Sequence, residues 1–317
     1  MTGAGGFVGS AVVRRLLVSD ARFSDGAPVE HVVALLRPGG SAERLEELPR
    51  DGTWSVEHAD VADSSVLRAV VEQTRPRAIV HAALDARVYA EDDERLIRDP
   101  LEALFGGLSG TATRFLQVGS AWVLESGEGL DESARLAPLT PYARNKAREE
   151  ALVPTLAKRA GIPWVNLRLF NLFGQHEKPS RLLPSLVAKL SRGETAELTQ
   201  GEQVRDFNDV DVAAQAFVDA LAAPDHACGA VYHIGSGRAT SVRELALMVS
   251  EIVGGEDLLR FGAAGAEDEG VPALVADPSR ATRVLGWRPD RDLQARLRTA
   301  VEWWIARSER SARGVTA

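Results

Sequence analysis

Short apolar runs alternate with amphipathic stretches through the first half of the chain. The apolar runs predict buried strands at residues 31–36, 53–60, 78–83, 115–120, 164–170 and 231–234. Between them, apolar positions recur at helical spacing in residues 41–49, 65–74, 94–108 and 141–160. This alternation predicts an α/β fold with a doubly wound parallel sheet and helices on both faces. Ligands of such sheets bind at the carboxyl ends of the strands.

The pattern changes after about residue 171, where helices dominate. Helices are predicted at residues 182–192, 210–222, 241–253 and 294–309, with a short extended piece at 196–199. We therefore expect a larger domain over residues 1–170 and a smaller C-terminal lobe over 171–317. Residues of about 210–235 are expected to return to the sheet of the larger domain.

Composition and charge narrow the class of protein. The 317 residues are 45% hydrophobic and 26% charged, which is ordinary for a globular protein. A net charge of −8 gives no general attraction to nucleic acid or to an anionic membrane. The single cysteine, Cys228, excludes an internal disulfide framework. No apolar run approaches the roughly 18 residues of a membrane span, and we expect a cytoplasmic protein.

The first residues, Met1 to Gly9, form a glycine-rich segment in which Gly3, Gly6 and Gly9 are spaced three apart. Such spacing lets the backbone turn tightly, approach a pyrophosphate and pack the following helix on a sheet. The amino end of that helix favours phosphate. Because the turn normally follows a strand, we expect the natural protein to begin roughly ten residues upstream, about one strand length, so that the first strand is truncated here.

A second candidate for chemistry is the pair Tyr142 and Lys146, at the start of the helix predicted over residues 141–160. Four-residue spacing puts both side chains on one helix face. An ammonium group near a phenol lowers the phenol pKa, so such a tyrosine can exchange a proton near neutral pH. Ser120 ends a predicted strand and offers a hydroxyl group for the same substrate oxygen. Taken alone, the Tyr–Lys spacing also fits an ordinary surface pair.

The glycine turn, the strand-end serine and the Tyr–Lys pair, in this order, resemble the extended short-chain dehydrogenase/reductases. The resemblance is to the nucleotide-sugar epimerase, dehydratase and ketoreductase branch, and it runs from residue 2 to about residue 305. Further matching segments are Asp60-Val61, His81-Ala82-Ala83, Arg168 to Gly174, Val204-Arg205-Asp206-Phe207 and Leu285 to Pro289. The family implies a Rossmann sheet that binds a dinucleotide and a C-terminal lobe that binds the substrate.

The resemblance also implies roles for the matching positions. The implied catalytic residues are Ser120, Tyr142 and Lys146, with Tyr142 as the acid or base. The implied cofactor contacts are Gly3, Gly6, Phe7, Val8, Gly9, Arg37, Asp60, Val61, Ala82, Ala83, Tyr142, Lys146 and Phe170. The implied substrate contacts are Ser120, Asn171, Arg181, Leu182 and Arg205, with Arg205 on the diphosphate. We expect no metal site.

Arg37 directly follows the strand predicted at residues 31–36, which is the second strand of the fold when the truncated first strand is counted, and enzymes that prefer NADH usually place an acid there. An arginine instead suits the 2′-phosphate of NADPH, with Ser41 and Arg44 as possible helpers. Dehydratases of this family carry a Thr-Asp-Glu run at the serine position, whereas this chain has Ser120-Ala121-Trp122. We therefore expect an NADPH-dependent reductase rather than a 4,6-dehydratase.

The expected reaction is reduction of the 4-keto group of a nucleoside-diphosphate 4-keto-6-deoxyhexose, in deoxysugar biosynthesis for antibiotics or O-antigens. Two alternatives stay open: a nucleotide-sugar 4-epimerase, and a non-catalytic NAD(P)-binding regulator. The expected partners are the nucleotide sugar and a second copy of the chain, since relatives dimerise through the two helices near 94–108 and 141–160. One departure concerns Glu267, Asp268 and Glu269, which stand where relatives carry a second diphosphate arginine.

Overall fold

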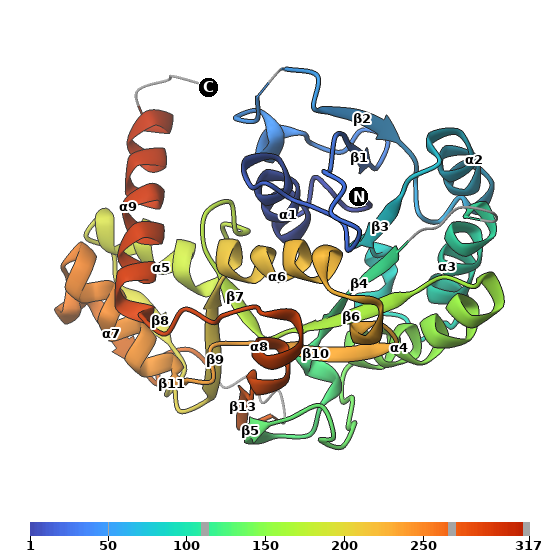
Figure 1. Ribbon diagram of the computed structural model, residues 1–317. Helices are drawn as coiled ribbons and strands as arrows, with labels where there is room; N and C mark the ends of the chain where they lie inside the picture. Colours follow the sequence, from blue (N-terminus) through green and yellow to red (C-terminus); the bar gives the residue numbers. More distant parts are fainter. Residues whose placement is uncertain (50, 109–113, 266–270, 313–317) are drawn as a thin grey trace.

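A computed structural model of the chain describes residues 1–49, 51–108, 114–265 and 271–312 (Figure 1). Its main sheet is parallel and has the spatial order β2–β1–β3–β4–β6–β10, with Thr2 bridging Leu35 on β1 and His81 on β3. These strands are β1 (Val32–Leu36), β2 (Trp54–His58), β3 (Ala78–His81), β4 (Arg114–Ser120), β6 (Trp164–Leu169) and β10 (Ala230–Ile234).

Helices cover both faces of this sheet. On one face α1 (Phe7–Val18) packs on α6 (Val210–Ala222), with α8 (Ser279–Leu285) beside α6. On the other face α2 (Ser64–Thr74), α3 (Arg95–Gly107) and α4 (Pro141–Ala160) pack in sequence. A separate hydrophobic core fills each face of the sheet. The expected α/β fold with a doubly wound parallel sheet is confirmed.

A second set of short strands joins the sheet to the C-terminal lobe. Its order is β11–β9–β13–β5, with β7 also paired to β9. The strands are β5 (Gly127–Leu130), β7 (Asn171–Phe173), β9 (Val204–Asp209), β11 (Ala239–Ser241) and β13 (Ala273–Ala276). In the lobe, β8 (Ala196–Leu198) pairs with β12 (Leu259–Phe261). Helices α5 (Leu182–Ser191), α7 (Val242–Val253) and α9 (Leu293–Ala312) pack around a third core.

The predicted helix over residues 41–49 is wrong. Only the single 3-10 turn η1 (Glu43–Leu45) forms there. Pro38-Gly39-Gly40 before it and Pro49 after it leave too few residues for a cooperative helix. Leu45 and Leu48 are nevertheless buried in the core beside α1, so their side chains are satisfied by tertiary packing without a helix.

Several expectations lie beyond what the described residues test. Thr2 is the residue that lies between β1 and β3, and the prediction of a further strand ahead of it remains a prediction. The division at residue 170 also remains one, although β10 pairs with β6 and α6 packs on α1. Glu267, Asp268 and Glu269 lie outside the described residues. None of the helices within the described ranges is long and apolar enough to cross a membrane.

Candidate active site

The glycine segment forms a closed turn that admits no side chains on its inner side. Gly3 has a φ of 66°, and a Cβ there would lie 2.8 Å from the backbone of Ala82. A Cβ on Gly9 would meet the Gly3 carbonyl oxygen far inside van der Waals contact. Gly6 caps α1 without a side-chain hydrogen bond, so the first amides of the helix face outward. This backbone cradle fits a pyrophosphate at a helix N-terminus.

A cavity of about 530 Å³ opens above this turn, at the carboxyl ends of β1, β2 and β3. Of the expected cofactor contacts, Gly3, Gly6, Arg37, Asp60, Val61, Ala82 and Ala83 line it. The expected contacts Phe7, Val8 and Gly9 lie within the first turn of α1 and are not part of the lining. The Phe170 side chain packs in a buried cluster with Ala121 and Val123. It lines neither this cavity nor the second cavity, which is lined by Asn171 and Arg205.

The two arginines that line this cavity, Arg37 and Arg44, differ in the hydrogen bonds that their side chains make. Arg44 donates from Nε to the His176 carbonyl oxygen at 2.8 Å and from Nη1 to the Gly5 carbonyl oxygen at 3.1 Å. It therefore braces the glycine turn. Arg37 is exposed, and within the described part of the chain its guanidinium group has neither a hydrogen-bond nor an ion-pair partner. Arg37 is thus the arginine of this cavity whose donors are not committed.

Helix α4 presents Tyr142 because its start is fixed by local signals. The Thr140 hydroxyl accepts a hydrogen bond from the Ala143 amide at 3.1 Å, and Pro141 occupies the first turn. The Tyr142 ring stacks on the ring of Tyr89, with centroids 5.1 Å apart and planes within 4°. Tyr89 also lines the cofactor cavity. Tyr142 does not itself line that cavity, but it contacts Tyr89, which does and which sequence reasoning did not identify.

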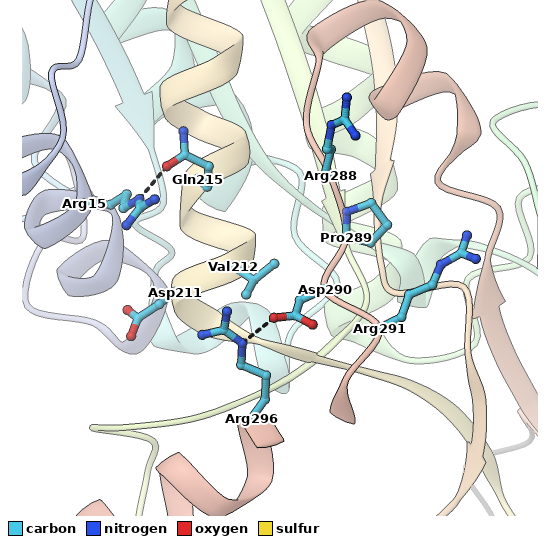
Figure 2. Close-up of a pocket in the computed structure, with 9 residues that line it drawn as sticks. All are labelled: Arg15, Asp211, Val212, Gln215, Arg288, Pro289, Asp290, Arg291 and Arg296. Carbon is cyan, nitrogen blue, oxygen red and sulfur yellow. Dashed lines mark hydrogen bonds and ion pairs between the residues drawn. The ribbon is translucent and has the colours of Figure 1, made fainter. Parts of the chain in front are cut away.

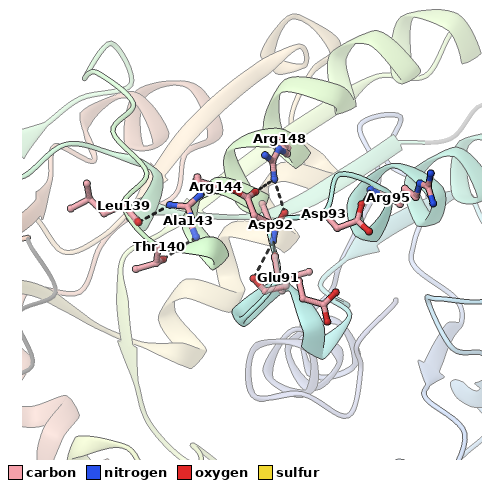
Figure 3. A network of polar contacts seen from close by, with 11 residues as sticks. Glu91, Asp92, Asp93, Arg95, Leu139, Thr140, Ala143, Arg144 and Arg148 are labelled. Atoms are coloured by element: carbon pink, nitrogen blue, oxygen red, sulfur yellow. Dashed lines mark hydrogen bonds and ion pairs between the residues drawn. The ribbon is translucent and has the colours of Figure 1, made fainter.

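A polar network holds the segment after Tyr89 against the start of α4 (Figure 3). Asp92 accepts from Arg144 Nε at 2.8 Å and forms a second ion pair with Arg148. Arg144 also donates to the Leu139 carbonyl oxygen at 2.8 Å. On the buried side, Asn145 donates to the Val88 and Glu91 carbonyl oxygens. These bonds hold the segment next to Tyr89 against the helix that carries Tyr142.

Lys146 and Ser120 complete the expected catalytic set from two different elements. The Lys146 ammonium is buried and donates to the Val118 carbonyl oxygen at 2.8 Å and to Glu149 Oε2 at 2.7 Å. Burial lowers its pKa, but Glu149 and the Tyr142 phenol offset this, so the pKa lies above its ordinary value. Ser120 ends β4, where its Oγ accepts from the Trp122 amide at 3.3 Å.

A second cavity, of about 280 Å³, lies in the C-terminal lobe. Of the expected substrate contacts, Asn171, Arg181, Leu182 and Arg205 line it and Ser120 does not, although Trp122 joins the lining from the segment after Ser120. The Arg205 guanidinium lies 5.4 Å from the centroid of the Trp122 ring and donates to the Val204 carbonyl oxygen. A guanidinium in a cavity of this kind suits a diphosphate.

Three buried polar oxygens line the same cavity without a hydrogen-bond partner in the described residues. They are Asn171 Oδ1, Glu177 Oε2 and Gln203 Oε1. Buried polar atoms are normally paired, so these atoms suit hydrogen-bond donors on a ligand. Sequence reasoning identified Asn171 but not Glu177 or Gln203, because nothing in their sequence neighbourhood shows that they are buried.

Glu177 predicts a pH dependence of stability. Burial raises the pKa of its carboxyl group from 4.5 to about 7, although Arg181 and the Gly174 amide act in the opposite direction. The folded state therefore binds more protons than the unfolded state, and the free energy of unfolding falls as pH rises through this range. We expect the free energy of unfolding of Glu177→Gln to fall by roughly 3 kcal/mol less than that of the wild type over this pH range. Urea denaturation between pH 4.5 and 8 measures it, with exposed Glu202→Gln as the baseline. A difference between wild type and Glu177→Gln that does not vary with pH would contradict the prediction.

A third cavity, of about 550 Å³, lies among α1, α6 and the segment that leads into α9 (Figure 2). Arg15 from α1 donates to Gln215 on α6, and Arg296 donates to Asp290. None of the expected catalytic, cofactor or substrate residues lines it. The candidate site therefore comprises the first two cavities and the start of α4, where Tyr142 stacks on Tyr89 of the first cavity.

The fold and this site define a Rossmann-type protein with a glycine cradle for a dinucleotide and an attached lobe. The chain belongs to the NAD dependent epimerase/dehydratase family, whose model matches residues 1–235. A dTDP-glucose 4,6-dehydratase of Salmonella typhimurium is 22% identical over 98% of this chain and 93% of that protein.

Solved structures give the same answer on the fold. DesIV, a dTDP-glucose 4,6-dehydratase from Streptomyces venezuelae solved with NAD and TYD bound, has a TM-score of 0.84 and 26% identity. The match covers 98% of this chain and 97% of that one. A UDP-glucose 4-epimerase from Thermotoga maritima has a TM-score of 0.81 and 24% identity, over 97% of this chain and 98% of that one, which shows the fold alone.

Proposed function

We propose that the protein reduces the 4-keto group of a nucleoside-diphosphate 4-keto-6-deoxyhexose with NADPH. The observation that carries the proposal is the pair Ala121 and Trp122 directly after Ser120. Ala121 is fully buried and Trp122 lines the substrate cavity, so neither of the two residues that follow the serine supplies a carboxylate to assist loss of water. The acid–base tyrosine and its lysine are present, and they would supply the proton that accompanies a hydride from the cofactor.

The cofactor supplies the hydride to the keto carbon when bound. Tyr142 donates its phenolic proton to the oxygen that becomes the new hydroxyl group, while the Ser120 hydroxyl hydrogen-bonds to the same oxygen. Arg205 binds the diphosphate and Asn171 binds the sugar part. The glycine cradle would hold the pyrophosphate of the cofactor, and Asp60 and Val61, which line the same cavity, would contact its adenine.

Arg37 supports NADPH over NADH, and this choice is testable. We expect Arg37→Asp to raise the KM for NADPH by roughly 10-fold or more and to lower that for NADH, since the guanidinium would bind the 2′-phosphate. Exposed Arg291→Asp, in the third cavity, makes the same charge change away from the site. Steady-state kinetics with both cofactors measure the effect, and an unchanged preference would show that Arg37 does not select the cofactor.

The reaction itself is tested with dTDP-, GDP- and CDP-4-keto-6-deoxyhexoses and NADPH. The proposal expects oxidation of NADPH that is matched by formation of one 4-hydroxy product, identified by NMR. Interconversion of 4-epimeric nucleotide sugars without net NADPH consumption would instead establish an epimerase, the alternative that the same Tyr–Lys pair allows. Cofactor binding with no turnover of any of these sugars would favour a regulator.

A further inference from the structure

Lys146 has a buried carboxylate partner on its own helix that the sequence pattern did not single out. Glu149 stands three residues after Lys146, and both side chains are at most 4% exposed. Glu149 Oε2 accepts from the ammonium at 2.7 Å, while the Val118 carbonyl oxygen on β4 accepts a second hydrogen at 2.8 Å. An ammonium group has three hydrogens, so one remains for a ligand.

The other oxygen of Glu149 faces a histidine from the neighbouring strand. His81 Nε2 on β3 lies 3.6 Å from Glu149 Oε1, and its Nδ1 is 2.8 Å from the Thr2 hydroxyl oxygen. That hydroxyl oxygen accepts from the amides of Ala82 and Ala83, so its own hydrogen is available to His81 Nδ1. This assigns the remaining ring hydrogen to Nε2, which points its positive end at Glu149.

We propose that Glu149 is a positioning residue: its carboxylate keeps the Lys146 ammonium charged and holds it on the Val118 carbonyl oxygen. This rests on the role proposed above for Lys146. The ion pair carries no net charge, so Lys146 acts on the active site mainly through its one remaining hydrogen bond. The contacts of His81 and Thr2 connect the same pair to the backbone of Ala82 and Ala83, on the wall of the cofactor cavity.

The physical reason is the cost of burying an ammonium ion. Without a carboxylate partner, burial would lower the pKa of Lys146 below its ordinary value of 10.5. The other titratable groups that face the pair are His81 from β3, Tyr142 one turn earlier on α4 and Tyr89 beside it. Burial lowers the pKa of His81 to about 3, so this ring is neutral and cannot replace the carboxylate.

The test follows the titration of Lys146 in the ligand-free protein. The chain has four lysines, at positions 146, 158, 178 and 189, so the side-chain carbons of labelled lysine give few NMR signals. Loss of one signal in Lys146→Met assigns it. We expect Glu149→Gln to lower the titration midpoint of Lys146 by about one pH unit or more, because a neutral partner no longer offsets burial. The other three lysines should titrate identically in both proteins.

Two further variants separate positioning from general loss of packing. Glu150→Gln breaks the adjacent buried ion pair with Arg168, which does not involve Lys146, and should leave the midpoint of Lys146 in place. Glu149→Asp keeps a carboxylate and should give an intermediate midpoint, which also serves if Glu149→Gln does not fold. An unchanged midpoint in Glu149→Gln, or an equal shift in Glu150→Gln, would overturn the proposal. The titration uses no substrate, so the midpoint of Lys146 tests the role of Glu149 even if the protein does not catalyse the proposed reaction.

Discussion

Replacing Tyr142 with phenylalanine is expected to lower kcat by roughly 10²- to 10⁴-fold, the usual contribution of a positioned acid or base. The change removes one hydroxyl group and keeps the ring that stacks on Tyr89 at 5.1 Å. The start of α4 depends on Thr140 and on the Asp92 network rather than on that hydroxyl group. We therefore expect the fold and the dissociation constant for the cofactor to change little. Single-turnover reduction with NADPH and fluorescence titration measure the two quantities separately.

Tyr232→Phe is the matched control for this variant. Tyr232 is buried, and its hydroxyl group donates to the Ala227 carbonyl oxygen at 2.7 Å, away from both cavities of the site. Its loss should lower the free energy of unfolding by about 1 kcal/mol and leave kcat in place. A decrease in kcat of less than tenfold for Tyr142→Phe would show that another group protonates the substrate.

The parts of the site that sequence reasoning identified are those whose requirements are local. Gly6 and Gly9 are required because each approaches the Gly3 carbonyl oxygen closely, and the start of α4 follows from Thr140 and Pro141. Tyr142 and Lys146 share a helix face by spacing alone. Each of these constraints involves residues within a few positions of one another, so a single sequence contains them.

Residues that act through distant contacts were not identified. Tyr89 stacks on Tyr142 from the short 3-10 helix η2 (Ala86–Tyr89), more than fifty positions earlier, and no periodic pattern marks that segment. Glu149 stands one position before Glu150, yet the first pairs with Lys146 and the second with Arg168. Which of two neighbouring glutamates contacts the lysine depends on the rotation of α4 against β4 and β6. That rotation is set by tertiary packing.

The same distinction explains why four short strands were not predicted. β5, β9 and β11 have polar or glycine residues at most positions, β13 is apolar but only four residues long, and β-propensity depends strongly on tertiary context. They form because each completes the hydrogen bonds of a neighbour across the lobe. The substrate cavity is built around this region, with Arg205 on β9, which explains why its lining was predicted less completely than the glycine turn.

Gly9→Ala is expected to abolish cofactor binding more completely than any single change at the rim of the cavity. The new methyl group would overlap the Gly3 carbonyl oxygen and crowd the Ala4 backbone, and neither can move as a flexible side chain can. Either the turn opens or α1 shifts away from the sheet, and both outcomes misplace the cradle for the pyrophosphate. We expect a dissociation constant for NADPH at least roughly 100-fold higher and a free energy of unfolding lower by about 1–3 kcal/mol.

Gly265→Ala is the control for Gly9→Ala, because a Cβ there meets no atom of the described residues within 4 Å and its φ is not in the left-handed region. Fluorescence titration with NADPH and urea denaturation should find this control close to wild type. If Gly9→Ala bound NADPH with wild-type affinity, the glycine turn would not be the pyrophosphate site. If it lost stability but kept affinity once folded, the turn would matter for packing α1 on the sheet and not for the ligand. The glycine turn is therefore assigned as the pyrophosphate site if Gly9→Ala loses affinity for NADPH at temperatures well below its unfolding. Such a loss reports on ligand binding by the turn and not on the packing of α1.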